Sequence, residues 1–280
     1  MRRLHLFEIG EQSWCPSALR NGLTDYLTDM IEMGQPYAAA APLLTEALCC
    51  STRRDGIIGG AVAVETEMAP GQSVAEILDL ASGAAGPWRH LISLLAQGGT
   101  SVRVRLTDRF PNLAAYARLE RETNGRITGE PRPVWADSVP ADLTGFRTMF
   151  SAFHHFRPAD ARRVLADAVA RREGIAIFEA TRRDLQAVLL MCLTPLFVVA
   201  VTPFIRPFRW SRLLLTYIVP AIPLAVLFDG VVSCLRTYTP AELRALAEAI
   251  DAAGYTWSTG EVGTGPIPMT YLIGAMTGTR

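Results

Sequence analysis

A run of small residues in the first third of the chain has the composition of a ligand-binding turn. It reads Ala-Ser-Gly-Ala-Ala-Gly-Pro over residues 81–87, and it follows an apolar segment, residues 74–80, that predicts a strand. A helix is expected over residues 88–96, because apolar side chains recur there at helical spacing. Small side chains let a backbone approach a ligand closely, and a helix N-terminus offers free N–H groups. The turn therefore predicts a binding site where this strand ends.

A carboxylate stands where it could complete such a site. Asp108 follows residues 101–106, whose alternating side chains predict the next strand. An acidic residue at the end of the second strand of a parallel sheet can bind the diol of a ribose. The pattern therefore predicts a cofactor that contains a nucleoside. The alternative is a tight turn, with Asp108 capping the next helix.

Two adjacent histidines are candidates for proton transfer. His154 and His155 follow the fourth expected strand, residues 145–150, and an unperturbed imidazole titrates near neutrality. One of them could act as a general base; alternatively, the pair caps the helix expected over 158–172 and shapes the cofactor site. Glu179, at the end of the fifth expected strand, is a second catalytic candidate. Its alternative role is an ion pair with Arg182 or Arg183.

Other chemistries find no support in the sequence. The 4 histidines and 5 cysteines do not form the paired spacing of a zinc site, so no metal is expected. Neither a Gly-x-Ser-x-Gly elbow nor a P-loop occurs. Cys49 and Cys50 are adjacent and no disulfide framework is evident, which favours a cytoplasmic location. Trp14, Tyr26 and Tyr37 could line a substrate pocket, but we favour a packing role.

The elements that would position these residues alternate along the chain. After residue 74, expected strands alternate with expected helices, which predicts a mainly parallel sheet covered on both faces. The remaining expected strands and helices cover residues 113–120 (helix), 127–135 (strand), 174–180 (strand), 240–250 (helix), 255–261 (strand) and 269–273 (strand).

Two helices expected over 17–31 and 37–49 precede the sheet. The predicted organisation is an N-terminal helical cap, residues 1–55, and a sheet domain, residues 56–280, that carries an apolar helical insert at about 186–236. No secretory signal is expected, because Glu8, Glu11 and Asp25 interrupt the N-terminal apolar residues.

The insert holds two apolar runs, residues 187–205 and 213–228, which contain prolines and are separated by three arginines. At 1.5 Å per residue the first run reaches about 28 Å as a helix, close to what crossing a bilayer requires. Three interpretations are open: two short membrane spans, a hairpin that enters one leaflet, or buried helices that form a pocket lid or a dimer interface. We favour the third.

Composition limits the classes of function. The 280 residues carry 27 basic and 27 acidic side chains, so the formal net charge is +0. Binding to nucleic acid needs clustered basic residues and is not expected. Half of the residues are hydrophobic (50%) and the mean hydropathy is +0.21, which excludes a disordered chain. The apolar excess is concentrated in the insert.

Four segments together resemble the class I S-adenosylmethionine (SAM)-dependent methyltransferases. The family's motif I, Asp/Glu-x-Gly-x-Gly-x-Gly, is matched by Asp79, Ala81, Gly83 and Ala85. Residues 107–112, 134–140 and 150–156 are similar to the family's next three motifs. The resemblance covers about residues 74–180 and resumes at about 239. It implies a Rossmann-like α/β fold with a seven-stranded sheet, mainly parallel with an antiparallel last strand.

The resemblance also implies a cofactor site for SAM, with S-adenosylhomocysteine as product. Two motif-I glycines are replaced by alanine, at Ala81 and Ala85, so the closest approach of the backbone is expected at Gly83 or Gly86. The residues expected to bind the cofactor are Asp79, Ala81, Ser82, Gly83, Gly86, Asp108, Arg109, Phe110, Ala136, Asp137 and Ser138.

The expected function is methyl transfer to a small, hydrophobic acceptor. One alternative is another SAM chemistry, such as cyclisation of SAM or transfer of its aminocarboxypropyl arm. The other is a non-catalytic binding subunit that contacts a membrane through residues 187–228. A homodimer formed through the insert is also compatible with the sequence.

Overall fold

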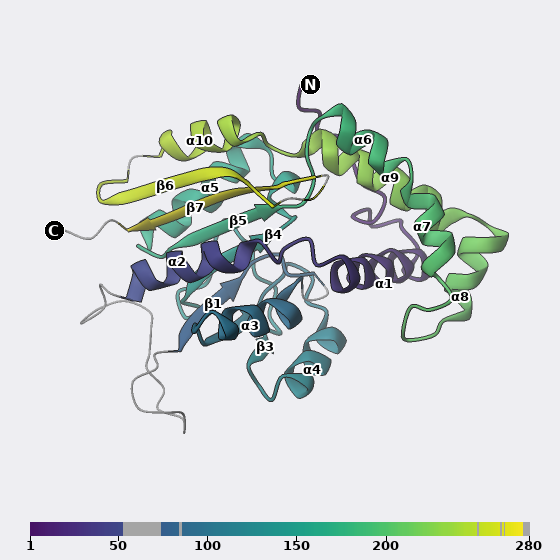
Figure 1. The fold of residues 1–280 in the computed structure, drawn as a ribbon, viewed down its shortest axis with the longest axis horizontal. Helices are drawn as coiled ribbons and strands as arrows, with labels where there is room; N and C mark the ends of the chain where they lie inside the picture. Colours follow the sequence, from purple (N-terminus) through teal and green to yellow (C-terminus); the bar gives the residue numbers. More distant parts are fainter. Residues whose placement is uncertain (53–73, 84–85, 251, 264, 266, 277–280) are drawn as a thin grey trace. The chain divides into compact units, whose positions relative to one another are not determined.

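The computed structural model describes residues 1–52, 74–83, 86–250, 252–263, 265 and 267–276 (Figure 1). The chain forms two compact units, each built from two segments of sequence. The helical unit contains Met1–Gln35 and Thr181–Thr239, and the sheet unit contains Pro36–Ala180 and Pro240–Arg280.

The sheet unit is built on a seven-stranded sheet in the order β3-β2-β1-β4-β5-β7-β6. Neighbouring strands are parallel except at β7, which is antiparallel to both β5 and β6. The strands are β1 (Ala75–Asp79), β2 (Val102–Leu106), β3 (Ile127–Gly129), β4 (Phe146–Phe150), β5 (Ile175–Glu179), β6 (Tyr255–Val262) and β7 (Met269–Met276). This topology confirms the predicted fold class.

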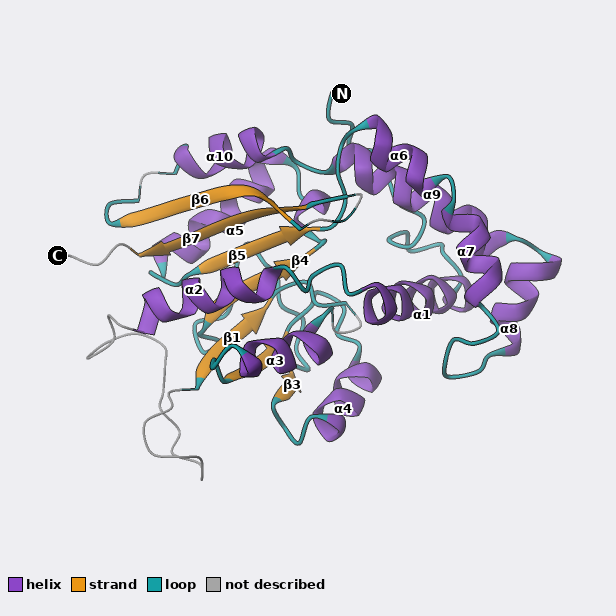
Figure 2. Ribbon diagram, in the orientation of Figure 1, coloured by secondary structure: helices purple, strands orange, loops and turns teal. Residues whose placement is uncertain are grey.

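Helices lie on both sides of this sheet (Figure 2). They are α2 (Ala40–Thr52), α3 (Trp88–Gln97), α4 (Leu113–Glu122), the short 3₁₀ helix η1 (Phe153–His155), α5 (Pro158–Ala170) and α10 (Pro240–Glu248). Their buried faces follow the helical period: in α3 these are Trp88, Leu91, Ile92 and Leu95. Pro158 begins α5, where its missing N–H costs nothing.

Strand β3 is shorter than predicted. The sequence favoured an extended segment over 127–135, but the strand ends at Gly129. Pro131 and Pro133 follow, and a proline cannot donate a hydrogen bond to a neighbouring strand. The chain instead turns, and Glu130 and Asp142 both bind Arg132, each with an N···O distance of 2.6 Å.

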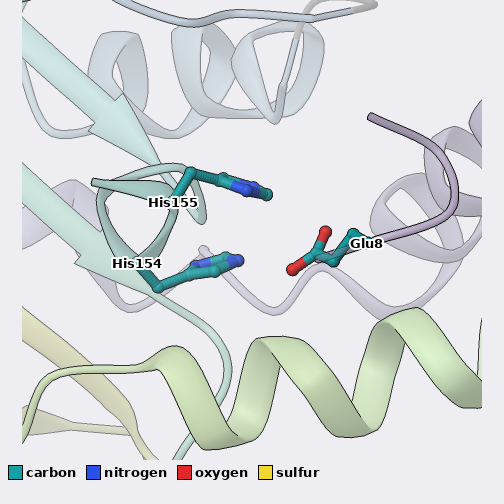
Figure 3. Close-up of side chains that lie close together, drawn as sticks. All are labelled: Glu8, His154 and His155. Carbon is teal, nitrogen blue, oxygen red and sulfur yellow. The ribbon is translucent and has the colours of Figure 1, made fainter. Parts of the chain in front are cut away.

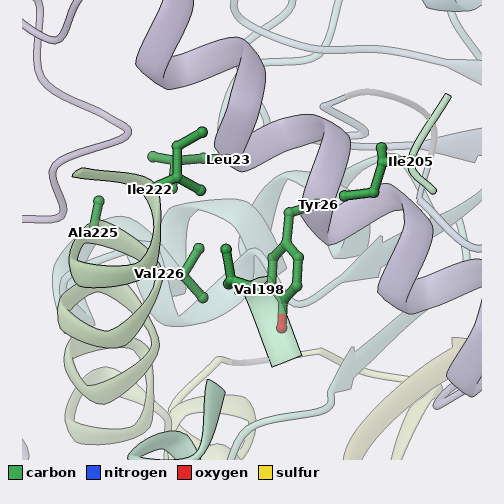
Figure 4. Packing of buried hydrophobic residues seen from close by; sticks show 7 residues of the cluster. All are labelled: Leu23, Tyr26, Val198, Ile205, Ile222, Ala225 and Val226. Atoms are coloured by element: carbon green, nitrogen blue, oxygen red, sulfur yellow. The ribbon is translucent and has the colours of Figure 1, made fainter. Parts of the chain in front are cut away.

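The helical unit contains α1 (Ser17–Gly34), α6 (Leu185–Met191), α7 (Thr194–Val201), α8 (Trp210–Leu213), the π-helical turn η2 (Leu214–Ile218) and α9 (Ala221–Arg236). Its hydrophobic core joins α1 to the apolar segments: Leu23, Tyr26, Val198, Ile205, Ile222, Ala225 and Val226 pack together (Figure 4). Prolines divide the apolar runs into these short helices, since Pro195 lies in the first turn of α7 and Pro220 directly precedes α9.

The division into units differs from the expected one, which grouped both N-terminal helices into a cap over residues 1–55. Helix α1 packs against α8 and α9 of the expected insert, whereas α2 packs against α3 and β7 of the sheet unit. The insert therefore forms a core with α1, and α2 belongs with the sheet.

Within the described residues, no single helix is long and apolar enough to cross a membrane. Trp210–Ile218 and Ala221–Arg236 meet that requirement only as a pair, and the two segments are bent by 79°.

Candidate active site

The small-residue turn after β1 adopts the backbone conformation that glycine favours. Ala81, Gly83 and Gly86 all have positive φ angles, of 54°, 55° and 53°. Alanine pays about 1–2 kcal/mol for this left-handed conformation, so the turn is held by its surroundings. Ser82 supplies part of that support, because its hydroxyl donates to the Asp79 carbonyl at 2.9 Å and accepts from the Thr107 N–H at 3.2 Å. Ala84 and Ala85 lie outside the described residues.

Open space lies beside this turn. Among the described residues, a Cβ added at Gly83 would meet nothing within 4 Å, and one added at Gly86 would meet only a carboxylate oxygen of Asp79, at 4.0 Å. The described residues therefore leave open space at both glycines, and the expected approach of a ligand there stays a prediction. A substituent at Gly86 would point toward a buried acid.

Asp108 takes the position predicted for a ribose-binding carboxylate. One of its oxygens accepts the Gly83 N–H at 2.9 Å and the other accepts the Phe110 N–H at 2.7 Å. The alternative role, capping α4, belongs to Asn112, whose side chain accepts from the Ala115 N–H at 3.2 Å. Asp108 thus connects the turn after β1 to the loop after β2.

Two aromatic rings project beside Asp108. The side chains of Phe110 and Trp135 are 76% and 50% exposed, and the Arg109 guanidinium lies 5.2 Å and 5.8 Å from their ring centroids. The backbone joins the two loops, since the Val134 N–H donates to the Asp108 carbonyl at 2.9 Å. Such rings could hold a planar base. Trp135 was not among the residues predicted to bind the cofactor.

The other predicted residues of this loop form a tight turn. Trp135 and Ser138 are joined by a β-bridge, and Ala136 is buried beneath it. The Asp137 carboxylate pairs with Arg163 of α5, at 3.0 Å.

Asp79 is a buried acid at the end of β1. Its side chain accepts the Thr148 hydroxyl at 2.6 Å, a contact from the neighbouring strand that the sequence analysis missed. Burial raises the pKa of the Asp79 carboxyl to about 6, although the hydrogen bond from the Thr148 hydroxyl opposes the shift. A cation bound beside Asp79 would favour the charged form.

The raised pKa of Asp79 predicts a pH-dependent stability. Because the folded chain holds this proton more tightly than the unfolded chain, the associated stability is present at low pH. It is lost as the pH rises from 3.8 to about 6, a loss of about 3 kcal/mol. Asp79→Asn carries no charge and should gain stability relative to the wild type over this range. Urea unfolding of both proteins across the range measures the difference, and a difference independent of pH would contradict the assignment.

The structure brings two separately predicted catalytic candidates together. The Nδ1 atom of His154 lies 2.6 Å from a carboxylate oxygen of Glu179, and the other oxygen accepts the His154 backbone N–H at 3.0 Å. Both side chains are buried. Glu179 thus binds His154 and not Arg182 or Arg183, the partners considered in its alternative role. Arg182 pairs with Asp184 at 3.0 Å. A carboxylate that holds Nδ1–H orients the ring and makes Nε2 the proton-accepting atom.

His155 lies next to His154 in η1, with ring centroids 4.2 Å apart (Figure 3). Glu8, also labelled in Figure 3, belongs to the helical unit, where Ser233 and Arg236 donate to its carboxylate. Neither histidine caps α5, whose N-cap is Arg157. The expectation of no metal site stays a prediction.

Sequence reasoning missed a second hydrogen-bonded cluster, centred on the half-buried Ser151. Ser151 follows β4 with a φ of 42°, and its Oγ accepts from the Tyr37 hydroxyl at 2.7 Å and from the Ala180 N–H at 3.0 Å. Tyr37 therefore packs beneath the ends of β4 and β5, while Tyr26 lies in the helical core. Trp14 is 64% exposed.

No family model matches the chain, and no curated protein matches it. Solved structures do show similarity. The CMeT domain of the citrinin polyketide synthase is 13% identical over 74% of this chain (TM-score 0.43). An O-methyltransferase family 2 protein from Planctomyces limnophilus, in complex with apigenin, is 13% identical over 96% of this chain (TM-score 0.47). Magnesium protoporphyrin IX methyltransferase from Synechocystis, with bound SAH, is 12% identical over 86% of this chain (TM-score 0.46).

This chain spans 48% of the first of these structures, 68% of the second and 84% of the third. Its seven-stranded sheet, mainly parallel with an antiparallel last strand, β7, is the one that the resemblance to class I SAM-dependent methyltransferases implies. The resemblance holds for the fold.

Proposed function

We propose that the sheet unit binds SAM and transfers its methyl group to a small, apolar acceptor that carries a hydroxyl group. The observation that carries the proposal is the position of Asp108. Its carboxylate lies between the turn after β1 and the loop after β2, and Asn112 rather than Asp108 caps the following helix. That is where a nucleoside diol binds in this class of sheet.

The described residues fit such a cofactor. Asp108 would bind the ribose, Phe110 and Trp135 would flank the base, and the turn at Gly83 and Gly86 would leave room for the chain that bears the sulfonium. The buried Asp79 carboxylate would stabilise positive charge. When bound, SAM supplies an activated methyl group, so the protein has mainly to align the acceptor and remove its proton.

The His154–Glu179 pair is suited to that proton transfer. Glu179 holds the imidazole at Nδ1, at 2.6 Å, and the His154 backbone N–H at 3.0 Å. The Nε2 atom would take the proton of the acceptor hydroxyl as the hydroxyl oxygen receives the methyl group. A base at this position favours an acceptor that loses a proton, such as a phenol.

Asp108→Ala should weaken SAM binding about ten- to hundredfold, because a hydrogen bond to a charged group contributes about 1.5–3 kcal/mol. Calorimetric titration with SAM measures the effect. The matched control is Asp142→Ala, which removes an exposed carboxylate that pairs with Arg132 outside the site. A wild-type chain that does not bind SAM, or an Asp108→Ala variant that binds it as well as the control does, would contradict the proposal.

The chemistry needs a separate measurement. The chain is incubated with methyl-labelled SAM, alone and with a panel of lipophilic phenols. Methyl transfer gives S-adenosylhomocysteine only when an acceptor is present. Methylthioadenosine formed from SAM alone would instead support cyclisation, and methylthioadenosine formed only when an acceptor is present would support aminocarboxypropyl transfer. SAM binding without any turnover would favour a non-catalytic subunit.

A further inference from the structure

Residues 185–228 of the helical unit contain no acidic residue and no lysine, and Arg206, Arg209 and Arg212 are their only charges. We call these residues the apolar segment. Many of its large side chains are exposed even though the unit has its own core: Leu196 is 69% exposed, Phe204 and Trp210 are each 77% exposed, and Ile218 is 73% exposed. Exposed apolar surface of this extent marks a site of interaction.

Helix α7 shows that this surface is not the outer side of an ordinary amphipathic helix. Val198 is fully buried in the core, whereas Leu196, Phe197 and Val199 on the same helix are exposed. A helix that is hydrophobic all round is typical of surroundings that are apolar on every side. Its outward side chains therefore need an apolar environment of their own.

The loop between α7 and α8 combines aromatic rings with positive charge. Phe204, Phe208 and Trp210 alternate with Arg206 and Arg209 in the sequence Phe-Ile-Arg-Pro-Phe-Arg-Trp. Arg209 pairs with Asp25, and within the described chain no carboxylate pairs with Arg206. Aromatic rings beside arginines are typical of segments that lie at the interface of a membrane.

Buried contacts hold this loop in place. Arg212 is 2% exposed, and it donates to the carbonyls of Ile205 and Pro207 at 2.6 Å and 2.9 Å. It also pairs with Asp25 of α1 at 2.5 Å. The loop is therefore presented in one conformation, which lowers the entropic cost of docking.

The positive charge of the apolar segment favours a lipid surface over a second copy of the chain as its partner. In a twofold dimer through the apolar segment the same residues would face each other. The two copies of Arg206 would then lie in one interface, with no acidic residue in the segment to neutralise them. Anionic headgroups complement both features, the positive loop and the apolar side chains beside it.

We infer that the apolar segment docks on a lipid surface that carries anionic headgroups, with Phe204 and Trp210 entering the acyl region and Arg206 at the headgroups. The docked state needs no spanning helix, and Trp210–Ile218 and Ala221–Arg236 are bent by 79°. This inference rests on the proposed function and extends it. The acceptor of the methyl group would be a molecule dissolved in the membrane.

Flotation of the full chain with vesicles tests the inference, with phosphatidylcholine alone compared with phosphatidylcholine mixed with phosphatidylglycerol. The wild type should float with the mixed vesicles. Arg206→Gln should lower this binding about fivefold and leave binding to neutral vesicles unchanged. Phe204→Ser combined with Trp210→Ser should lower binding to both kinds of vesicle at least about tenfold.

Leu27→Ser combined with Met33→Ser is the matched control, because both residues are exposed on α1 of the same unit but lie outside the segment. It should float like the wild type. A wild type that stays with the soluble fraction, a control that loses binding equally, or a solution dimer that Phe204→Ser with Trp210→Ser disperses would each overturn the inference.

SAM affinity, measured in parallel, separates this inference from the proposed function. A chain that binds SAM but no vesicles rejects the docking alone. A chain that binds vesicles but no SAM rejects the proposed activity alone.

Discussion

Replacing His154 with glutamine should lower kcat for methyl transfer about 10²- to 10⁴-fold, the usual contribution of a positioned general base. Glutamine retains polarity and approximate size but cannot accept a proton at neutral pH. Affinity for SAM should stay near the wild-type value, because the residues assigned to the cofactor lie after β1, β2 and β3. The rate is measured as S-adenosylhomocysteine release, with an acceptor found in the phenol panel.

His155→Gln is the matched control, since Glu179 binds His154 and the two histidines are neighbours in η1. It should lower kcat far less. Glu179→Gln addresses the positioning role: it should lower kcat while KM is retained, because an amide no longer fixes the imidazole in the required tautomer. Equal losses for His154→Gln and His155→Gln would contradict the assignment of the base.

Asp25→Ala should destabilise the helical unit by about 3–5 kcal/mol, because it leaves the buried Arg212 guanidinium without the carboxylate that pairs with it. The Asp25 carboxylate binds Arg212 at 2.5 Å and Arg209 at 3.1 Å. Hydrogen exchange locates the effect: amides of α1 and of residues 202–216 should lose protection, while those of β1 and β4 keep it.

Arg209→Ala provides the comparison, since its side chain is 41% exposed and it shares the same acid. An exposed pair contributes about 0–1 kcal/mol, so this variant should be nearly as stable as the wild type. Combining Asp25→Ala with Arg212→Met should recover part of the stability, because the unpaired charge is removed. No recovery would mean that the bonds from Arg212 to the loop carbonyls matter more than its charge.

Local patterns predicted the strands and turns that hold the residues proposed to bind the cofactor. Asp79 ends one strand and Asp108 follows the next. Both strands are short apolar or alternating runs followed by turns, and such a run predicts a strand without knowledge of its neighbours in space. The end of β3 was mispredicted, because Pro131 and Pro133 outweigh the preference of the surrounding residues for an extended strand.

Contacts between elements could not be predicted in the same way. His154 and Glu179 were separate candidates, because their contact depends on β4 and β5 being neighbours in register. The signal was present: both residues follow parallel strands at the same edge of the sheet. For α1 the sequence held no comparable signal, since its partner Ile222 lies on α9 and helical spacing does not say which helix covers an apolar face.

The discontinuous build of both units has a consequence for synthesis. Helix α1 leaves the ribosome first, and at about 5–20 residues per second α9 follows it roughly 10 to 40 s later. Until then Leu23 and Tyr26 lack Ile222 and Val226, with which they share a core. Completion of the sheet is also delayed, because β7, which lies between β5 and β6, is synthesised only after the second segment of the helical unit. We therefore expect the nascent chain to depend on chaperones until its last strand emerges.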